Sequence, residues 1–378
     1  MAKVIVTGIL GQDGANMAQY LLDNTNHEVF GAMRRSAAPN YINVEEFRDH
    51  DRFHLVFLDL VDANSIEKVV TDIQPDYFVN FAANSFVGIS WTMPERVFDV
   101  NALGVLRCLE AIKKIRPSCR FYSAGSSEEF GDVDYSPQDL NHPIKPRSPY
   151  GASKSAARGI VKVYRESYDL YAVHGILFNH EGPKRGEEFV TRKITKGVAR
   201  IKVALEGNQK FDPIELGNLD SQRDWSDSRD FVKGVWMMVN QDEYRKEKTG
   251  EVKDYLLSSG KTYSVREFIK MAFEAAGIKI KWSFRGTTGN SASPENEVVE
   301  DDHGSVLVRI NPKFYRPADV DLLLGDSSLI REELGWKPEI DLWEMVKDMV
   351  NKDIDIESHN ERMFQFRAEE DENFRIIR

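Results

Sequence analysis

Three glycines at a spacing of three follow the first apolar segment of the chain. Residues 3–8 read KVIVTG, and Gly8, Gly11 and Gly14 form a GxxGxxG pattern that continues into GANMAQYLLDN, residues 14–24. The first run predicts a strand and the second an amphipathic helix. Glycines in such a turn permit close approach to a pyrophosphate, and the helix N-terminus attracts its charge. A dinucleotide site in a parallel α/β sheet is therefore predicted, with a glycine-rich turn without ligand as the alternative.

The first half of the chain repeats this alternation of strand and helix. Further strands are expected within 28–33, 53–60, 75–83, 119–127 and 172–178, and helices at 65–73, 96–115 and 150–168. We predict an α/β fold: a Rossmann-type doubly wound parallel sheet with a smaller, mainly C-terminal substrate-binding domain. The sheet domain would comprise residues 1–177 with a return segment at about 228–262, and the second domain 178–227 and 263–378. Residues 284–304, rich in Gly, Ser and acidic side chains, are expected to form a mobile loop.

Bulk composition excludes several classes of function. The net charge is −11, from 50 basic and 61 acidic residues, which argues against a nucleic-acid or anionic membrane surface. Cys108 and Cys119 are the two cysteines, so neither a disulfide framework nor a metal cluster is expected. No signal peptide or membrane-spanning run is visible, and we expect a cytoplasmic protein without a metal.

Tyr150 and Lys154 stand four residues apart in PRSPYGASK, at the start of a predicted helix. Positions i and i+4 lie on one helix face, so the phenol and the ammonium would be neighbours. A free tyrosine has a pKa of about 10, and a nearby cation lowers it. An isolated pair of this kind is more often a surface tyrosine beside a solvated lysine, so its context must decide.

The ends of the predicted strands supply candidate cofactor contacts. Strand two ends with Met33, Arg34 and Arg35, without the carboxylate that would bind the 2′-hydroxyl of an NAD ribose. Arginines accommodate a 2′-phosphate, so NADP is favoured over NAD. Asp59 and Leu60 end strand three, and the superfamily that the motifs below resemble often holds the adenine at this position. At the end of strand four, small residues suit the close passage of a nicotinamide ribose; the candidates there are Phe81, Ala82, Ala83 and Ser85.

The glycine spacing and the tyrosine–lysine pair resemble the short-chain dehydrogenase/reductase superfamily. Strand five delivers AGSSEEFG about 20 residues before Tyr150. The resemblance implies that Ser126 hydrogen-bonds the substrate oxygen and Tyr150 takes its proton. Lys154 would lower the pKa of the tyrosine and bind the nicotinamide ribose. Glu128 adds a carboxylate that could remove the C5 proton of a sugar substrate once C4 of that sugar is a ketone. Alternatively, Glu128 is merely a polar residue at a strand end. The side chain of Glu129 would point away from the site.

Longer blocks of the sequence resemble one family, the GDP-mannose 4,6-dehydratases. These blocks are TGILGQDG, SSEEFG, PRSPYGASK, ILFNHEGPKRGEEFVTRKIT, GNLDSQRDW, YRPADVDLLLGD and LGWKPEI, spread over nearly the whole chain. The resemblance implies conversion of GDP-mannose to GDP-4-keto-6-deoxy-mannose and water, with one bound NADP. It further implies cofactor contacts from Gln12, Asp13, His180 and Arg185, and substrate contacts from Ser85, Asn179, Lys193, Arg223 and Arg316, beside Ser126, Glu128 and Tyr150.

Three departures from the family pattern affect finer expectations. Ser126 stands where the family commonly has threonine, and the residues after RDW read SDSRDF instead of the usual continuation. The segment after RRS, AAPNYINVEE, differs where the family forms tetramer contacts, so a homodimer is expected more firmly than a homotetramer. Two rival functions are an epimerase or reductase acting on a related nucleotide sugar, and a cofactor-sensing binding protein, which would typically lack the Tyr–Lys pair.

Overall fold

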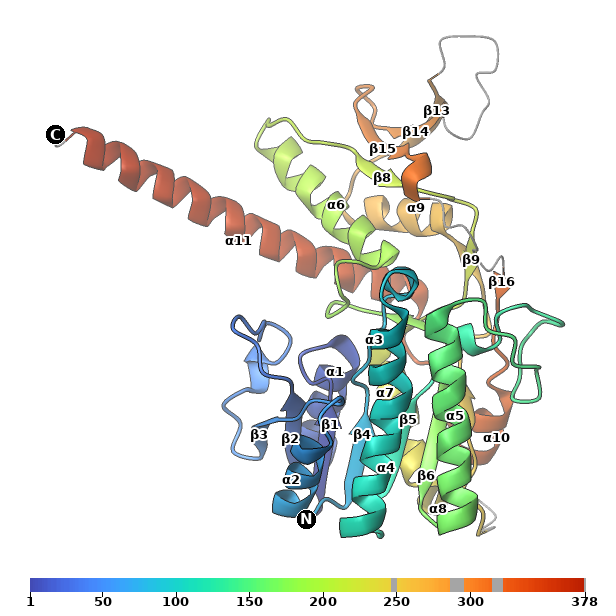
Figure 1. Ribbon diagram of the computed structural model, residues 1–378. Coiled ribbons are helices and arrows are strands. Elements are labelled where there is room, and N and C mark those ends of the chain that lie inside the picture. The colour runs from blue at the N-terminus through green and yellow to red at the C-terminus, as the bar shows by residue number, and fades with distance from the viewer. Residues whose placement is uncertain (246–249, 286–295, 315–321, 377–378) are drawn as a thin grey trace. The chain divides into compact units, whose positions relative to one another are not determined.

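The chain folds into two compact units, seen in the computed structural model of Figure 1. The structure describes residues 1–245, 250–285, 296–314 and 322–376, and most of their side chains as far as residue 360. Unit 1 consists of Met1–Lys184, Gln222–Thr262 and Val320–Asp341; unit 2 consists of Arg185–Ser221, Tyr263–Asp319 and Leu342–Arg378. The predicted limits placed residues 178–184, 222–227 and 320–341 in the second domain, whereas the structure groups them with the sheet.

Local contacts explain this difference in grouping. Strand β7 (Asn179–Glu181) pairs with β10 (Trp225–Asp227), which leads directly into helix α7 (Ser228–Val239) of unit 1. The buried side chain of Asp230 accepts hydrogen bonds from the backbone of Glu339 and Ile340, at 2.7 and 2.8 Å. These bonds join segments that are distant in sequence, and composition alone did not indicate them.

A seven-stranded parallel sheet forms the centre of unit 1, in the order β11-β6-β5-β4-β1-β2-β3. The strands are β1 (Lys3–Thr7), β2 (Glu28–Met33), β3 (Phe53–Phe57), β4 (Tyr77–Asn80), β5 (Arg120–Ala124), β6 (Ala172–Leu177) and β11 (Tyr255–Leu257). The predicted Rossmann-type doubly wound fold is confirmed. Because the order reverses between β1 and β4, a crevice is expected at the carboxyl ends of these two strands, where such folds bind ligands.

Alternating side chains of the strands build two cores on opposite faces of the sheet. Val4 and Val6 pack in one core and Ile5 in the other, as the two-residue period of a strand requires. The first core also contains α1 (Gln12–Asn24) and α7; the second contains α2 (Ala63–Ile73), α4 (Gly104–Ile115) and α5 (Pro149–Tyr168). The sheet is thus covered on both faces, with the strand ends left for ligands.

The helix predicted at 96–115 is confirmed, and it contains one irregular turn. It consists of α3 (Pro94–Phe98), a π-helical turn, η3 (Asp99–Leu103), and α4. Asn101 lies in this turn, and its side chain bonds to other segments of the chain. Such local widenings of a helix occur frequently at functional sites.

The remaining elements of unit 1 are short. They are η1 (Glu45–Phe47), η2 (Val87–Trp91), η4 (Ser127–Glu129), β9 (Gln222–Arg223), α8 (Gln241–Tyr244), β16 (Leu322–Leu323) and α10 (Ser328–Leu334).

In its described residues, unit 2 combines the α-helices α6, α9 and α11 with a four-stranded sheet of order β13-β14-β15-β8. Its elements are α6 (Val190–Glu206), β8 (Ile214–Leu216), β12 (Tyr263–Ser264), α9 (Val265–Ala275), β13 (Lys281–Phe284), β14 (Glu297–Glu300), β15 (Val306–Ile310), η6 (Pro312–Phe314) and α11 (Leu342–Ile376). Ser264 and Glu267 form a capping box at the start of α9. The predicted loop 284–304 was partly wrong, because residues 297–300 pair with both β13 and β15; residues 286–295 lie outside the described part.

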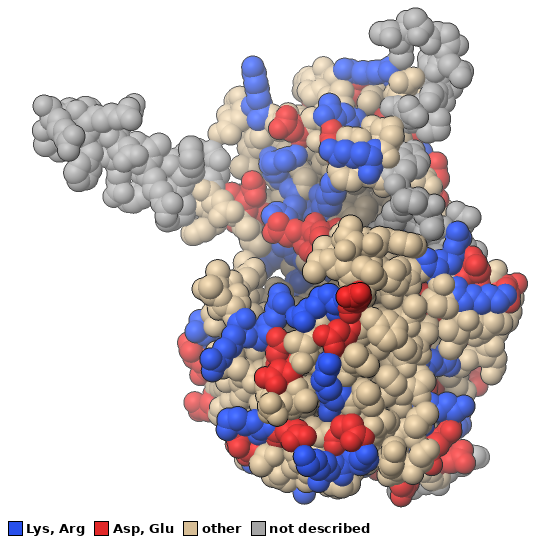
Figure 2. All heavy atoms as spheres, viewed as in Figure 1, with Lys and Arg blue, Asp and Glu red and all other residues tan. Residues whose placement is uncertain are grey.

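Surface and composition add three observations. Figure 2 shows Lys and Arg interspersed with Asp and Glu on the visible face. None of the helices in the described part of the chain combines the length and apolar character of a bilayer span. Within the same residues, no cluster of His, Cys, Asp and Glu is arranged to hold a metal ion.

Candidate active site

The glycine turn after β1 is built for close backbone approach. Gly8 has φ +68°, and a Cβ there would lie 3.0 Å from the backbone nitrogen of Ala82. A Cβ on Gly14 would lie 2.4 Å from the carbonyl oxygen of Gly8. Gly11 is the N-cap of α1 and supplies no side chain to the helix N-terminus. Gly11 therefore does not cap the first backbone N–H groups of α1. Binding of a pyrophosphate at this helix N-terminus would require such uncapped N–H groups.

Three predicted cofactor residues come together beside this turn. The Nε2 group of Gln12 donates to the carbonyl oxygen of His180 at 3.0 Å, and Nε2 of His180 lies 3.0 Å from Oδ2 of Asp13. Nδ1 of His180 lies 2.7 Å from the carbonyl oxygen of Phe178. Both ring nitrogens thus face oxygen acceptors, an arrangement that a doubly protonated ring satisfies completely.

The end of β4 is fixed by a residue that the sequence reading did not select. Thr7 donates through its hydroxyl to Oδ1 of Asn80 at 2.7 Å and accepts from the backbone N–H of Ala82 at 3.0 Å. This hydroxyl holds residues 80–82 against the glycine turn. Phe81 packs its ring 5.7 Å from that of Tyr122, while Ala83 and Ser85 continue the segment.

The ends of β2 and β3 differ in exposure. Met33 is buried, whereas Arg34 and Arg35 are exposed, and the guanidinium of Arg35 lies 5.2 Å from the ring centre of Phe57. Asp59 accepts from the backbone N–H of Val61 at 3.2 Å, and Leu60 is buried. Both arginines are therefore accessible at the end of β2.

Ser126, Glu128 and Glu129 occupy the short helix that follows β5. Ser126 is the N-cap of η4, and its hydroxyl accepts from the backbone N–H of Glu128 at 3.2 Å. Glu129 completes a capping box by accepting from the backbone N–H of Ser126 at 2.8 Å, and it is fully buried. Glu128 is partly exposed. The two adjacent glutamates thus have different environments.

Helix α5 positions Tyr150 and Lys154. Its N-cap Ser148 accepts from the backbone N–H of Gly151 at 3.0 Å, and Pro149 occupies the first turn. Both Tyr150 and Lys154 are buried, with Nζ of Lys154 5.8 Å from the ring centre of Tyr150. Nζ donates to the carbonyl oxygen of Ala124 at 2.7 Å. Burial lowers the pKa of Lys154 to about 8, against the opposing attraction of Glu129 and Asp13.

Two close contacts tie this helix to the other parts of the site. A Cβ on Gly151 would lie 2.4 Å from the carbonyl oxygen of Glu128, so η4 and the start of α5 are in direct contact. Asn101 donates to Oγ of Ser153 at 3.1 Å and accepts from the backbone N–H of Asn84 at 2.8 Å. Ser153 in turn donates to the carbonyl oxygen of Tyr150 at 2.6 Å. Asn101, which sequence reasoning missed, therefore connects the end of β4 to the catalytic helix.

Two predicted substrate residues of unit 1 lie on short strands. Asn179 pairs with Trp225 between β7 and β10, and its buried Oδ1 has no hydrogen-bond partner among the described residues. Arg223, on β9, donates to the carbonyl oxygen of Gln222 at 2.8 Å. Arg316 lies outside the described residues.

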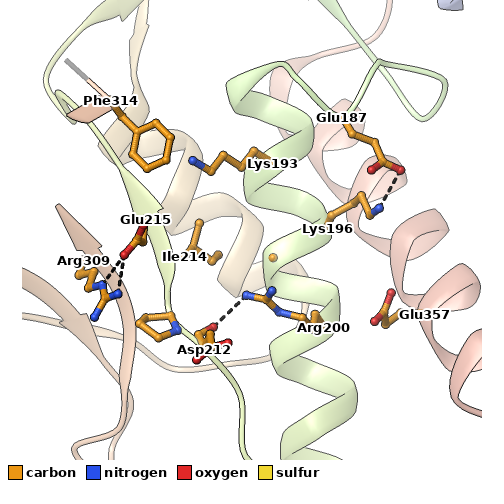
Figure 3. A pocket seen from close by; sticks show the side chains of 12 residues that line it. Glu187, Lys193, Lys196, Arg200, Asp212, Ile214, Glu215, Arg309, Phe314 and Glu357 are labelled. Atoms are coloured by element: carbon orange, nitrogen blue, oxygen red, sulfur yellow. Dashed lines mark hydrogen bonds and ion pairs between the residues drawn. The ribbon is translucent and has the colours of Figure 1, made fainter. Parts of the chain in front are cut away.

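Unit 2 has a cavity of about 700 Å³ that is lined by α6, β8 and their neighbours, with both basic and acidic side chains (Figure 3). Lys193 points toward the ring of Phe314, with Nζ 3.5 Å from the ring centre, and burial lowers its pKa. Lys196 pairs with Glu187 at 2.7 Å. The guanidinium of Arg185, elsewhere in unit 2, lies 3.5 Å from the ring centre of Phe189. The cavity offers cations to an anionic ligand; Lys196 was not predicted, because a single lysine on a helix has no distinctive sequence signal.

Comparison with known proteins decides the family. The family model described as GDP-mannose 4,6 dehydratase matches residues 5–349. The chain belongs to this family. It is 41% identical to the GDP-mannose 4,6-dehydratase of Yersinia enterocolitica over 364 residues, covering 94% of each chain. It is 38% identical to the human GDP-mannose 4,6 dehydratase over 361 residues, covering 93% of this chain and 91% of the human one.

Solved structures of other nucleotide-sugar enzymes share the fold of this GDP-mannose 4,6-dehydratase family member. The dTDP-glucose 4,6-dehydratase of Streptomyces venezuelae, solved with NAD, superimposes with a TM-score of 0.73 at 20% identity, over 93% of this chain and 96% of that one. The predicted family resemblance is confirmed by the family model and the relatives, and this likeness supports the fold.

Proposed function

We propose that this chain converts GDP-mannose to GDP-4-keto-6-deoxy-mannose and water. Family membership supplies the substrate class, and one structural observation supports the reaction: Glu128 is joined directly to the start of the helix that carries Tyr150, through the contact of its carbonyl with Gly151. Oxidation at C4 alone needs a hydroxyl-directed base, whereas removal of water also needs a base for the C5 proton. The site offers a separate side chain for each task.

The glycine turn fits a dinucleotide, because its backbone leaves no space for side chains at Gly8 and Gly14. The N-terminus of α1 would face the pyrophosphate, with Gln12 and Asp13 beside it. Arg34 and Arg35 would bind the 2′-phosphate of NADP, and Asp59 and Leu60 the adenine. When bound, NADP would accept a hydride from C4 of the sugar and return it at C6.

Proton transfer at C4 would involve three residues. Tyr150 takes the proton of the 4-hydroxyl while the C4–H bond breaks, and Ser126 donates a hydrogen bond to the same oxygen. The charge of Lys154 favours the phenolate of Tyr150. Nζ of Lys154 is already fixed to the carbonyl of Ala124, which leaves its other N–H groups for a ribose hydroxyl.

Glu128 would act after the ketone has formed. The C5 proton is then acidic, and the carboxylate removes it while the C6–O bond breaks and the hydroxyl leaves as water with the proton that Tyr150 took from the 4-hydroxyl. The partial exposure of Glu128 allows the carboxyl group to exchange its proton with solvent. The proton finally placed at C5 would therefore come from solvent, which makes the step observable with deuterium.

The GDP-sugar would be held by the polar residues predicted for it. Asn179 has a buried oxygen available for a donor on the ligand, and Lys193 and Arg223 supply cations for the diphosphate. Ser85, Arg316, His180 and Arg185 complete the proposed contacts to sugar and cofactor.

Cofactor choice is expected to depend on the two arginines after β2. In the Arg34→Ala, Arg35→Ala double variant, we expect NADP binding to weaken at least about tenfold more than NAD binding, because only NADP has a phosphate for them. Titration of both cofactors measures this. Lys68→Ala, which removes an exposed cation that pairs with Asp72 on α2, is the control. Equal losses for the two cofactors, or tighter NAD binding by the wild type, would contradict NADP preference.

We propose a homodimer formed by α4 and α5 against a second copy, with a homotetramer as the less supported alternative. Large apolar side chains are exposed on α5 and in the turn before α4: Val163 at 52%, Tyr168 at 50% and Leu103 at 38%. Sedimentation at micromolar concentration is expected to give a dimer, and Val163→Glu to shift it toward monomer. A monomeric wild type, or a variant that stays dimeric, would count against this interface.

The activity itself is tested by incubating the NADP-loaded enzyme with GDP-mannose and analysing the sugar by mass spectrometry. A 4-keto-6-deoxy sugar is expected. An unchanged formula with inverted C4 would instead support an epimerase, and a product two hydrogens richer a reductase. A cytosolic location belongs to the same proposal, since both cysteines are free and buried.

A further inference from the structure

A buried carboxylate and a buried imidazole lie directly behind the proposed catalytic segment. Glu129 and His174 are both 0% exposed, and Oε1 of Glu129 lies 2.9 Å from Nε2 of His174. The same oxygen accepts from the backbone N–H of Ser126 at 2.8 Å. A Cβ on Gly125 would lie 2.3 Å from Nε2 of His174, so the pair is packed tightly against the chain just before Ser126.

The hydrogen-bond pattern identifies the protonation states of this pair. Nδ1 of His174 and Oε2 of Glu129 have no hydrogen-bond partner among the described residues. A neutral imidazole with its hydrogen on Nε2 donates to Glu129 and leaves no buried donor unpaired. A proton on Oε2 would be such an unpaired donor, which is unfavourable in the interior. The pattern therefore favours a neutral His174 and an ionised Glu129.

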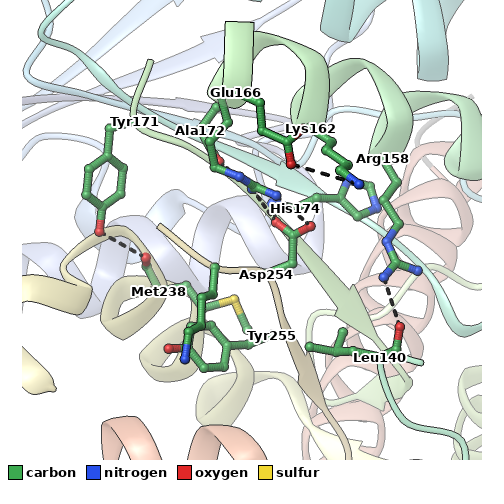
Figure 4. Close-up of polar contacts among 12 residues, drawn as sticks. Leu140, Arg158, Lys162, Glu166, Tyr171, Ala172, His174, Met238, Asp254 and Tyr255 are labelled. Carbon is green, nitrogen blue, oxygen red and sulfur yellow. Dashed lines mark hydrogen bonds and ion pairs between the residues drawn. The ribbon is translucent and has the colours of Figure 1, made fainter. Parts of the chain in front are cut away.

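The backbone of His174 is held by a second, partly buried network. Its N–H donates to Oδ1 of Asp254 at 2.8 Å (Figure 4). Asp254 also pairs with Arg165 of α5 at 2.7 Å. Strand β6 and helix α5 are thereby joined at His174.

The hydrogen bonds of Glu129 do not by themselves require a negative charge. Both involve Oε1, and a glutamine oxygen accepts both equally well. Burial of an ionised carboxylate costs free energy unless a cation compensates it. Glu129 acts on the cation Lys154. Burial lowers the pKa of Lys154 to about 8, and the negative charges of Glu129 and Asp13 oppose this lowering. Lys154 and Glu129 also anchor adjacent carbonyl and amide groups, those of Ala124 and Ser126.

We propose that Glu129 is a positioning residue for the catalytic pair. Its carboxylate holds the backbone of Ser126 and supplies the charge that keeps Lys154 protonated, and His174 fixes that carboxylate in place. This inference rests on the catalytic roles proposed above for Ser126, Tyr150 and Lys154. It predicts that the charge of Glu129 sets the pH range of the reaction, separately from its effect on structure.

Asp13 on α1 acts on Lys154 together with Glu129, and the ring of Tyr150 on α5 lies 5.8 Å from its Nζ. Behind Glu129, His174 on β6 contacts its Oε1, and Asp254 before β11 accepts from the backbone of His174. Glu129→Gln removes the charge of one member and retains the Oε1 bonds, and it places N–H donors where Oε2 has no partner among the described residues. The other groups remain as a constant background.

The test compares two variants by the pH dependence of kcat/KM for GDP-mannose. Glu129→Gln is expected to move the alkaline limb of the profile to lower pH by about one unit, because Lys154 then loses its proton more readily. Glu129→Asp keeps the charge but shortens the reach to Ser126. The Glu129→Asp variant should have a lower rate, while the alkaline limb of its profile stays within a few tenths of a pH unit of the wild-type limb.

Four results are distinguishable. A fall in rate for Glu129→Gln without displacement of the alkaline limb overturns the proposal and assigns a structural role. If Glu129→Gln does not fold, displacement of the alkaline limb in Glu129→Asp overturns the proposal equally. His174→Gln, which retains a donor toward Glu129, should keep the wild-type limb, and a large displacement would contradict neutrality of His174. Failure of the proposed function would appear differently, as a wild type with no Tyr150-dependent product.

Discussion

Replacement of Tyr150 by phenylalanine is expected to stop the reaction before any change in the sugar. The variant keeps the ring that packs in the buried start of α5 but lacks the oxygen that takes the 4-hydroxyl proton. Without that base the C4–H bond does not break, and no reduced nicotinamide accumulates. Loss of a positioned base typically lowers a rate by about 10²–10⁴-fold, and we expect the upper part of this range. Stopped-flow absorbance of the bound cofactor in a single turnover measures it.

Tyr168→Phe is the matched control, because it removes a phenol from the exposed end of the same helix. It should leave the rate of cofactor reduction near that of the wild type. Unimpaired reduction of the cofactor in Tyr150→Phe would mean that another group takes the proton, and the role of the tyrosine–lysine pair would then be wrong.

Glu128→Gln is expected to fail one step later. The variant keeps Tyr150 and Lys154, so oxidation at C4 proceeds and the reduced cofactor accumulates. Without the carboxylate, the C5 proton is not removed and water is not lost. A barrier raised by about 4 kcal/mol corresponds to a rate lowered by roughly a thousandfold. Cofactor absorbance in a single turnover, with mass analysis of the sugar and its deuterium content, separates the two steps.

Asp132→Asn serves as control for this variant, since it removes a nearby exposed carboxylate that pairs with Arg147 at 3.2 Å. Its deuterium incorporation at C5 should equal that of the wild type. Should Glu128→Gln form the 6-deoxy product at a near wild-type rate, Glu128 is structural and another residue must be the C5 base.

The sequence allowed prediction of those features that depend on local pattern. The glycine spacing after β1, the strand–helix alternation and the Tyr150–Lys154 interval each occupy a few consecutive residues, and the fold they predicted is confirmed. Backbone geometry imposes these spacings directly: Gly8 has a positive φ, and no Cβ fits at Gly14. A sequence that adopts this turn therefore shows glycines at these positions.

Contacts between distant segments were not predictable in this way. Asn101 hydrogen-bonds to Ser153, which lies 52 residues further along the chain, and Glu129 contacts His174, 45 residues further along. An asparagine inside a helical pattern and a second glutamate beside Glu128 have no local signal of their own. The assignment of residues 320–341 to the sheet unit likewise depends on hydrogen bonds to Asp230, which only the folded chain reveals.

The fate of a label at C4 tests the dehydratase proposal most directly. The wild-type enzyme with NADP is given GDP-mannose that carries deuterium at C4, in ordinary water, and the product is analysed by mass spectrometry and NMR. We expect a 4-keto-6-deoxy sugar with the deuterium at C6 of the same molecule and a solvent proton at C5. Deuterium retained at C4 in an epimerised sugar, or a 4-keto product without deuterium at C6, would contradict the proposed function.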